Sequence, residues 1–223
     1  MKAITNLASH VHCWSRNDDK RLYRLVCYLD TTVTHNLTGR VGDPPECLEL
    51  RLYVDADFAG DWEDTKSTSG GYLVLYGPHT YMPISWMCKK QTSTSRSTTE
   101  SEVVSLAASL FAEVIPMMQL WSTMLGRNIH LTICEDNTAT IKVLQKGYSP
   151  KLRHVARTHK INLGSVFECL QEGDIELEYC HTDLQAADVF TKAVAPQKWD
   201  KAMELLGIKP NPQTAAVIAK MNE

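Results

Sequence analysis

The sequence lacks the features that mark three classes of protein. Its seven cysteines are odd in number and form no Cys-x-x-Cys pair, so neither a disulfide framework nor a zinc site is indicated. No run reaches the roughly 18 to 20 apolar residues of a membrane span, and the start lacks a signal-peptide core. The net charge of −3 argues against a protein that coats nucleic acid by bulk electrostatics. We therefore expect an intracellular, reduced, soluble protein with no membrane partner.

Positive charge is nevertheless concentrated in one segment. No acidic residue lies between Asp136 and Glu168, whereas this stretch holds six basic residues. They are Lys142, Lys146, Lys151, Arg153, Arg157 and Lys160. Such a stripe could follow a phosphate backbone. The plainer alternative is a solvated helix face.

The spacing of apolar residues predicts an α/β fold. Period-2 alternation and turn residues predict strands over residues 50–58, 72–76, 81–88, 129–134 and 175–179. Helical spacing predicts helices over residues 98–125, 138–146, 155–171, 184–192 and 197–206. Residues 65–71 read as a turn, and Pro116 is expected to kink or divide its helix. The order β-β-β-α-β-α-α-β-α predicts a five-stranded mixed sheet with helices on its faces.

Three regions are predicted along the chain. Residues 1–47 resemble an incomplete unit, in which a helical pattern around Leu22–Leu29 is followed by a polar, turn-rich stretch that ends at Pro44-Pro45. Residues 48–208 form the main domain. Residues 209–223, with two prolines, are expected to be a weakly ordered tail.

Acidic residues occupy the positions at which α/β sheets build sites. Asp55 lies on the first strand and Asp136 ends the fourth, while Glu100 or Glu102 and Asp188 lie at helix starts. Strand ends and helix starts converge on one rim of such a sheet. Four carboxylates there would repel one another unless a cation neutralised them, so the cluster implies a metal. Ligands that are all oxygen favour Mg²⁺ or Mn²⁺ over Zn²⁺.

Three acids have alternative interpretations. Ser97 and Glu100 form a capping box, and Thr99 with Glu102 repeats the pattern. If Ser97 is the N-cap, Glu102 lies one turn inside the helix and faces the sheet rim, so we favour Glu102 as the ligand and Glu100 as the cap. We interpret Asp57 as a turn former or as a residue just outside the metal ligands.

Seven motifs together give a resemblance to a known family. In chain order they are YVDADFAG (53–60), STSGGY (67–72), SWMCKKQ (85–91), SRSTTESE (95–102), EDN (135–137), RTHK (157–160) and ADVFTK (187–192). From about residue 50 to residue 208, the chain resembles the ribonuclease H domain at the end of the polyprotein of Ty1/copia-type LTR retrotransposons. YVDAD is not the polymerase motif YxDD, because it lacks adjacent aspartates.

The resemblance implies a fold, an activity and partners. The fold is ribonuclease H-like, and the catalytic acids map onto Asp55, a glutamate of the first helix (Glu102 or Glu100), Asp136 and Asp188. Two Mg²⁺ ions, or Mn²⁺ in their place, about 4 Å apart would support endonucleolytic cleavage of the RNA strand of an RNA–DNA hybrid. Ribose 2′-hydroxyls would be read in the minor groove. Residues 1–47 would be the tail of the reverse-transcriptase region, whose polymerase domain is a partner, and the location would be cytoplasmic, in virus-like particles.

Further residues are candidates for contact with the hybrid or its products. His181 lies where cellular and retroviral relatives carry a mobile histidine that helps product release; the alternative is a strand-end histidine in solvent. The residues expected to bind nucleic acid are Lys89, Lys90, Arg96, Asn137, Lys151, Arg153, Arg157 and Lys160. His154 and His159 either help to bind phosphate or do nothing, and RTHK departs from the family's usual Thr-Lys-His order.

Two rival functions stay open. One is a catalytically silent nucleic-acid-binding or structural remnant of a retrotransposon polyprotein, although all four acidic positions are filled. The other is a transposase or integrase with the same general fold, which we disfavour because the glutamate falls on the first helix and not late in the chain.

Overall fold

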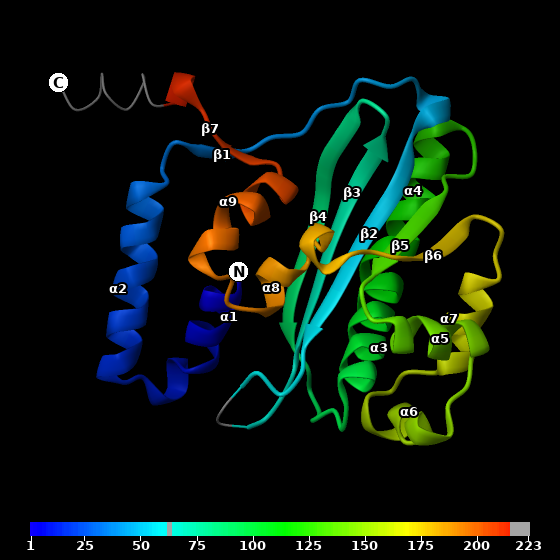
Figure 1. Cartoon of the computed structure of the whole chain (residues 1–223), viewed down its shortest axis with the longest axis horizontal. Helices are drawn as coiled ribbons and strands as arrows, with labels where there is room; N and C mark the ends of the chain where they lie inside the picture. The colour runs from blue at the N-terminus through cyan, green and yellow to red at the C-terminus, as the bar shows by residue number, and fades with distance from the viewer. Residues whose placement is uncertain (62–63, 215–223) are drawn as a thin grey trace.

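A five-stranded mixed sheet forms the centre of the molecule. The computed structural model describes residues 1–61 and 64–214. The strands are β2 (Glu49–Asp57), β3 (Thr68–Gly77), β4 (Thr80–Lys90), β5 (Leu131–Glu135) and β6 (Ile175–Tyr179). They lie in the order β4-β3-β2-β5-β6, in which β2, β3 and β4 are antiparallel neighbours and β2, β5 and β6 are parallel (Figure 1). The predicted mixed sheet is therefore confirmed.

Strand β2 lies at the centre because it is apolar on both faces. Leu50, Leu52 and Val54 pack into the larger core cluster, whereas Tyr53 belongs to a second cluster on the opposite face. A strand covered on both faces reads as a nearly continuous buried run, as parallel strands do. Because β2 and β5 are parallel neighbours, their carboxyl ends meet at one edge of the sheet.

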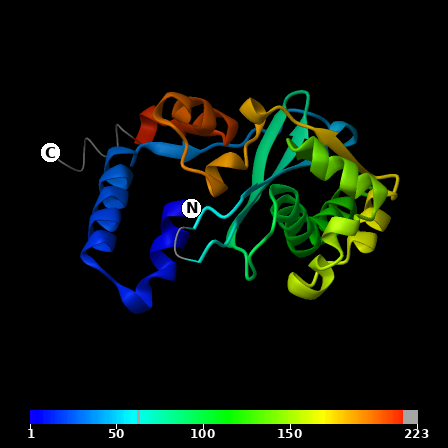
Figure 2. The ribbon, with the colours of Figure 1, turned by 60° about the horizontal axis from the view of Figure 1, so that its bottom comes forward.

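One face of the sheet is covered by a long helix. Helix α3 (Thr98–Ser109) continues through a π-helical turn, Leu110–Val114, into α4 (Ile115–Leu125). Pro116 lies in the first turn of α4, so the predicted disturbance takes the form of a π turn, which bypasses the missing N–H. Helices α5 (Thr138–Lys146) and α7 (Leu163–Leu170) complete this layer (Figure 2).

The run Thr98–Leu125 is long and apolar enough, by length and composition, to cross a membrane. Its side chains Val103, Leu106 and Leu110 are fully buried in the core cluster that includes β2 and β3. This is the pattern of a core helix in a globular domain.

The other face carries α8 (Asp188–Thr191) and α9 (Pro196–Leu205). Tyr72 of β3 packs against Phe190 of α8, and its hydroxyl donates to the carbonyl of Leu206 at 2.6 Å. The two short helices are thereby fixed over the middle of the sheet. Figure 2 shows them (orange) on the side opposite the green helices.

The N-terminal segment lies beside α8 and α9. It comprises α1 (Lys2–Ser9), α2 (Arg16–Thr31), which confirms the helix expected there, and β1 (His35–Leu37). Strand β1 pairs antiparallel with β7 (Ile208–Pro210), two short strands that the sequence did not predict. This pairing joins residues 35–37 of the N-terminal region to residues 208–210 at the end of the main domain. The domain boundaries stay a prediction. Residues 215–223 of the expected tail lie outside the described residues.

Three predicted elements differ from the observed ones. Strand β3 begins at Thr68, inside the expected turn 65–71. The expected helix 155–171 is two helices, α6 (Val155–Thr158) and α7, because Lys160 has a positive φ of 60° and Asn162 caps a new helix by accepting from Gly164 N at 2.9 Å. The expected helix 184–192 is a 3₁₀ turn, Thr182–Leu184, followed by α8.

Candidate active site

Asp55 is fully buried at the edge where β2 approaches α8. Its carboxylate accepts hydrogen bonds from the Thr191 hydroxyl and, at 2.9 Å, from the Lys192 ammonium. The residue opposite Asp55 on β3 is Gly70, where a Cβ atom would meet Thr191 Cγ2 at 2.5 Å. A glycine there is what allows α8 to lie close enough to reach Asp55.

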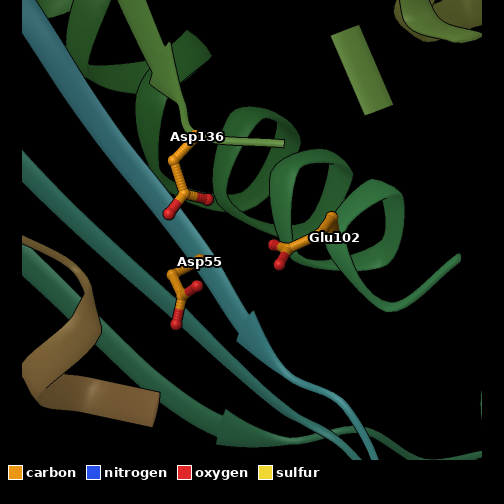
Figure 3. A group of neighbouring side chains, drawn as sticks. All are labelled: Asp55, Glu102 and Asp136. Atoms are coloured by element: carbon orange, nitrogen blue, oxygen red, sulfur yellow. The ribbon is translucent and has the colours of Figure 1, made fainter. Parts of the chain in front are cut away.

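Two further carboxylates point toward Asp55 (Figure 3). Glu102 lies on α3 and Asp136 directly follows β5. Ser105, three residues after Glu102, donates to the carbonyl of Asp55 at 2.7 Å, which fixes this part of α3 against β2. One carboxylate oxygen from each of the three acids lies within 4.8 Å of the others. We call Asp55, Glu102 and Asp136 the acidic cluster.

A fourth carboxyl group, Glu135, is buried beside the cluster and was not predicted. It is fully buried, and its Oε1 accepts from the backbone N–H of Asn137 at 3.0 Å. In β5 it alternates with Cys134 and shares a face with Ile133, so it points toward α3. That alternation, together with the acid pair at the strand end, was the sequence signal that could have found it.

Burial and mutual repulsion perturb these acids. Burial, with Glu135, Asp55 and Asp136 nearby, raises the pKa of Glu102 to about 10. Burial, with Asp136 and Asp55 nearby, raises the pKa of Glu135 to about 8, although its bond from Asn137 opposes the shift. Both residues keep a buried Oε2 atom that has no hydrogen-bond partner within residues 1–61 and 64–214. Unpaired carboxylate oxygens that repel one another fit a hard divalent cation, whose preferred ligands are oxygens.

Asp188 reaches the cluster through a lysine. The Lys192 ammonium bonds Asp188 Oδ1 at 3.0 Å and Asp55 Oδ1 at 2.9 Å. Burial and the charge of Asp55 raise the pKa of Asp188. Burial opposes the charge of Lys192, but attraction to Asp55 outweighs it and leaves the pKa of the ammonium raised. Lys192 belongs to the ADVFTK motif but was not a predicted site residue.

Glu100 points away from the cluster. Its Oε2 accepts from the backbone N–H of Arg96 and from His154 Nε2, both at 3.0 Å, and its Oε1 accepts from His159 Nε2 at 3.1 Å. The Ser97 hydroxyl accepts from Glu100 N at 3.2 Å, which is one half of the predicted capping box. In the other half, the Glu100 carboxylate accepts from the backbone N–H of Arg96 in place of that of Ser97. The geometry thus brings Glu102, and not Glu100, to Asp55.

Asp57 and His181 lie outside the cluster. Asp57 accepts from the Lys2 ammonium at 3.2 Å, a contact between the N-terminal helix and the end of β2. The His181 side chain is 65 % exposed, and its Nδ1 accepts from the backbone N–H of Asp183. The neighbouring Thr182 donates to Asp136 Oδ2 at 2.9 Å. The role predicted for His181 stays a prediction.

Some of the predicted nucleic-acid residues already have partners within the chain. Lys90 pairs with Asp61 at 2.6 Å and Asp64 at 3.0 Å, and the Asn137 side chain caps α5. The remaining predicted residues are all exposed: Lys89, Arg96, Lys151, Arg153, Arg157 and Lys160. Among these, Arg153 donates to the Tyr148 hydroxyl at 2.9 and 2.6 Å. The Ser93 hydroxyl donates to the carbonyl of Thr158 at 2.9 Å, which joins the loop after β4 to the basic segment.

Comparison with known proteins identifies the chain's relatives. It is 29 % identical over 211 residues, 92 % of its length, to "Retrovirus-related Pol polyprotein from transposon RE1" of Arabidopsis thaliana. It is 29 % identical over 215 residues, 94 % of its length, to the corresponding polyprotein from transposon RE2 of the same plant. The chain is a homologue of Ty1/copia-type retrotransposon Pol polyproteins. It spans 13 % and 14 % of the length of these two relatives.

This homology confirms the resemblance that the seven motifs carry. No protein-family model matches the chain. The solution structure of the PFV RNase H domain is 13 % identical, covering 77 % of this chain and 96 % of that one, with a TM-score of 0.42. The ribonuclease H-like fold of this Pol homologue is seen in its own strand order. Its elements follow the predicted order β-β-β-α-β-α-α-β-α across the main sheet, except that the expected helix 155–171 is divided into α6 and α7.

Proposed function

We propose that the chain is a metal-dependent ribonuclease H that cleaves the RNA strand of RNA–DNA hybrids during reverse transcription. The observation that supports this most strongly is the acidic cluster, in which Asp55, Glu102 and Asp136 converge from β2, α3 and β5. Among the described residues, the buried Oε2 atom of Glu102 and that of the neighbouring Glu135 have no hydrogen-bond partner, so they are suited to bind a cation. The homology to retrotransposon Pol polyproteins supports the choice of substrate class.

Each group of residues has a task in this proposal. Asp55, Glu102 and Asp136 would hold Mg²⁺, or Mn²⁺ in its place, with Asp188 available once Lys192 moves. Two divalent ions held by these acids would supply activation of a water and stabilisation of the leaving 3′ oxygen. The exposed basic residues would bind hybrid phosphates, which fixes the backbone across the cluster. Thr191 holds the Asp55 carboxylate in place from the α8 side.

Partners and location follow from the same proposal. The substrate partner is an RNA–DNA hybrid, recognised by shape and 2′-hydroxyls. The protein partner is the polymerase domain of the same polyprotein, in cytoplasmic virus-like particles.

A catalytically silent remnant is the second candidate, and one observation favours it. The Lys192 ammonium, 42 % exposed, already forms ion pairs with Asp55 and Asp188 and supplies one of the two positive charges that would balance them. A site with a permanent internal counter-ion would bind metal weakly.

The test is cleavage of an end-labelled hybrid by the purified chain with Mg²⁺, with Mn²⁺ and with EDTA. The enzyme hypothesis expects metal-dependent cleavage with 5′-phosphate and 3′-hydroxyl ends, which Asp55→Asn or Asp136→Asn abolishes while hybrid binding persists. Binding without cleavage in either metal would favour the remnant. Undiminished cleavage in EDTA would exclude the proposed mechanism.

A further inference from the structure

Glu100 lies at the centre of a buried group of hydrogen bonds that has no part in the proposed chemistry. We call this group, Glu100 with His154 and His159, the clasp. Its side chain is 1 % exposed, and both oxygens are engaged by His154, His159 and the backbone of Arg96. A carboxylate can only accept, so each histidine must donate its Nε2 proton. Such charge-assisted bonds are shorter and stronger than bonds between neutral groups.

The two histidines flank the most basic part of the chain. His154 and His159 lie on either side of α6, which has only four residues. Arg153, Arg157 and Lys160, beside or within this helix, are exposed. The clasp therefore holds both ends of a short cationic element, which we call the basic hairpin, residues 151–160.

A few other contacts also fix the basic hairpin. A helix of one turn has no stability of its own in water. The hairpin is anchored by the buried side chains of Leu152 and Val155, by the bond from Ser93 to the carbonyl of Thr158, and by Arg153, which donates to the Tyr148 hydroxyl at 2.6 and 2.9 Å. Lys160 also has a positive φ of 60°, a conformation that a non-glycine residue keeps only where its surroundings impose it. The buried His159 next to it is held by Glu100.

Helix α3 links this clasp to the acidic cluster. Glu100 and Glu102 are two positions apart, so their side chains leave the helix about 200° apart. One glutamate faces the cluster and the other faces the basic hairpin. A rigid helix between them fixes the distance from the phosphate-binding side chains to the reacting centre.

We propose that Glu100 is a positioning residue, which through His154 and His159 holds the basic hairpin in register with the acidic cluster so that a hybrid backbone spans both. This inference rests on the proposed ribonuclease H function. It assigns Glu100 to substrate binding and not to metal binding. Removing the hydrogen bonds of the clasp would leave the acidic cluster unchanged. The basic side chains that contact the hybrid would then no longer be held in fixed positions.

The test compares Glu100→Gln and His154→Ala with the wild-type chain. The matched control is Glu113→Gln, which removes a carboxylate from the same helical run, where it accepts from Ser85 at 3.0 Å far from the hairpin. The readouts are KM and kcat on hybrid, hybrid affinity against salt, Mn²⁺ affinity, and amide hydrogen exchange of residues 151–160. The last two need no substrate.

We expect both variants to raise KM roughly five- to tenfold, with kcat and Mn²⁺ affinity unchanged within about twofold, because contacts to phosphate are lost and contacts to metal are not. If two phosphate contacts are lost, the slope of log affinity against log salt falls by about 1.8. Amide exchange should quicken in the hairpin. Glu113→Gln should match the wild type in every readout.

Three outcomes would overturn the inference. Loss of Mn²⁺ affinity in Glu100→Gln, as expected for Glu102→Gln, would make Glu100 a metal ligand. Wild-type KM and exchange in both variants would show that the clasp holds nothing. A wild-type chain that neither binds nor cleaves hybrid would refute the proposed function and this inference with it, whereas an active wild type with unaffected variants refutes the inference alone. Should Glu100→Gln unfold, His154→Ala decides, since that side chain is 21 % exposed.

Discussion

Replacing Glu102 by glutamine is expected to stabilise the metal-free protein while it abolishes cleavage. Glu102 is 6 % exposed, and its pKa is raised from 4.5 to about 10 by burial and by the carboxylates of Glu135, Asp55 and Asp136. Between these two values the folded chain keeps a proton that the unfolded chain releases. The free energy of unfolding therefore falls as the pH rises through this window. Glutamine has the shape of the protonated acid and carries no such dependence.

The size of the effect follows from the titration. At about pH 7.5 the ionisation of Glu102 in the unfolded chain favours unfolding by up to ~4 kcal/mol, because each unit above the unfolded pKa contributes about 1.36 kcal/mol. Glu135 shares this repulsion and the site can relax, so we expect about 2 kcal/mol. For a chain of 223 residues this corresponds to a rise in Tm of roughly 4–8 °C.

The assay is thermal unfolding in EDTA at several pH values, with Glu113→Gln as the control. The Tm advantage of Glu102→Gln should be near zero at about pH 4.5 and should grow steadily towards about pH 7.5, as the linkage relation requires. Adding saturating Mg²⁺ should stabilise the wild type more than the variant, since the variant lacks a ligand. A variant that is less stable than the wild type at the higher pH, or an advantage independent of pH, would refute the electrostatic reasoning.

Two further predictions concern α8. Lys192→Met should bind Mn²⁺ roughly three- to tenfold more tightly by calorimetry, because removing the half-exposed ammonium leaves Asp55 and Asp188 without a positive partner. The same variant should have a lower Tm in EDTA. Weaker Mn²⁺ binding would show that Lys192 supports the metal site. Gly70→Ala should destabilise the protein by about 2 kcal/mol or more in urea unfolding, because its Cβ would meet Thr191 Cγ2 at 2.5 Å. A variant as stable as the wild type would show that α8 can shift away from β3 at little cost.

Local patterns were sufficient for most of the sheet. The alternation in residues 50–58 and 175–179 predicted β2 and β6, because successive side chains of a strand point to opposite faces of the sheet. The predicted helix 138–146 coincides with α5, whose ends Asn137 and Gly147 carry their own capping signals. Where local signals conflict, as at residues 155–171, the expected single helix was wrong. The left-handed conformation of Lys160, with a φ of 60°, separates α6 from α7, and the apolar spacing carries no signal for it.

The sequence by itself determined which acids could form a site, since the ends of parallel strands must share an edge of the sheet. Only the tertiary structure decided how they are partnered. It turned Glu102 toward Asp55 and Asp136, and it paired Glu100 with His154 and His159. It buried Glu135 with one oxygen bonded to Asn137, and it set Lys192 between two aspartates. Spacing along a chain specifies the face on which a side chain lies. The groups that the side chain contacts come from segments tens of residues away. These groups decide whether it binds a metal, keeps a proton or bonds another part of the protein.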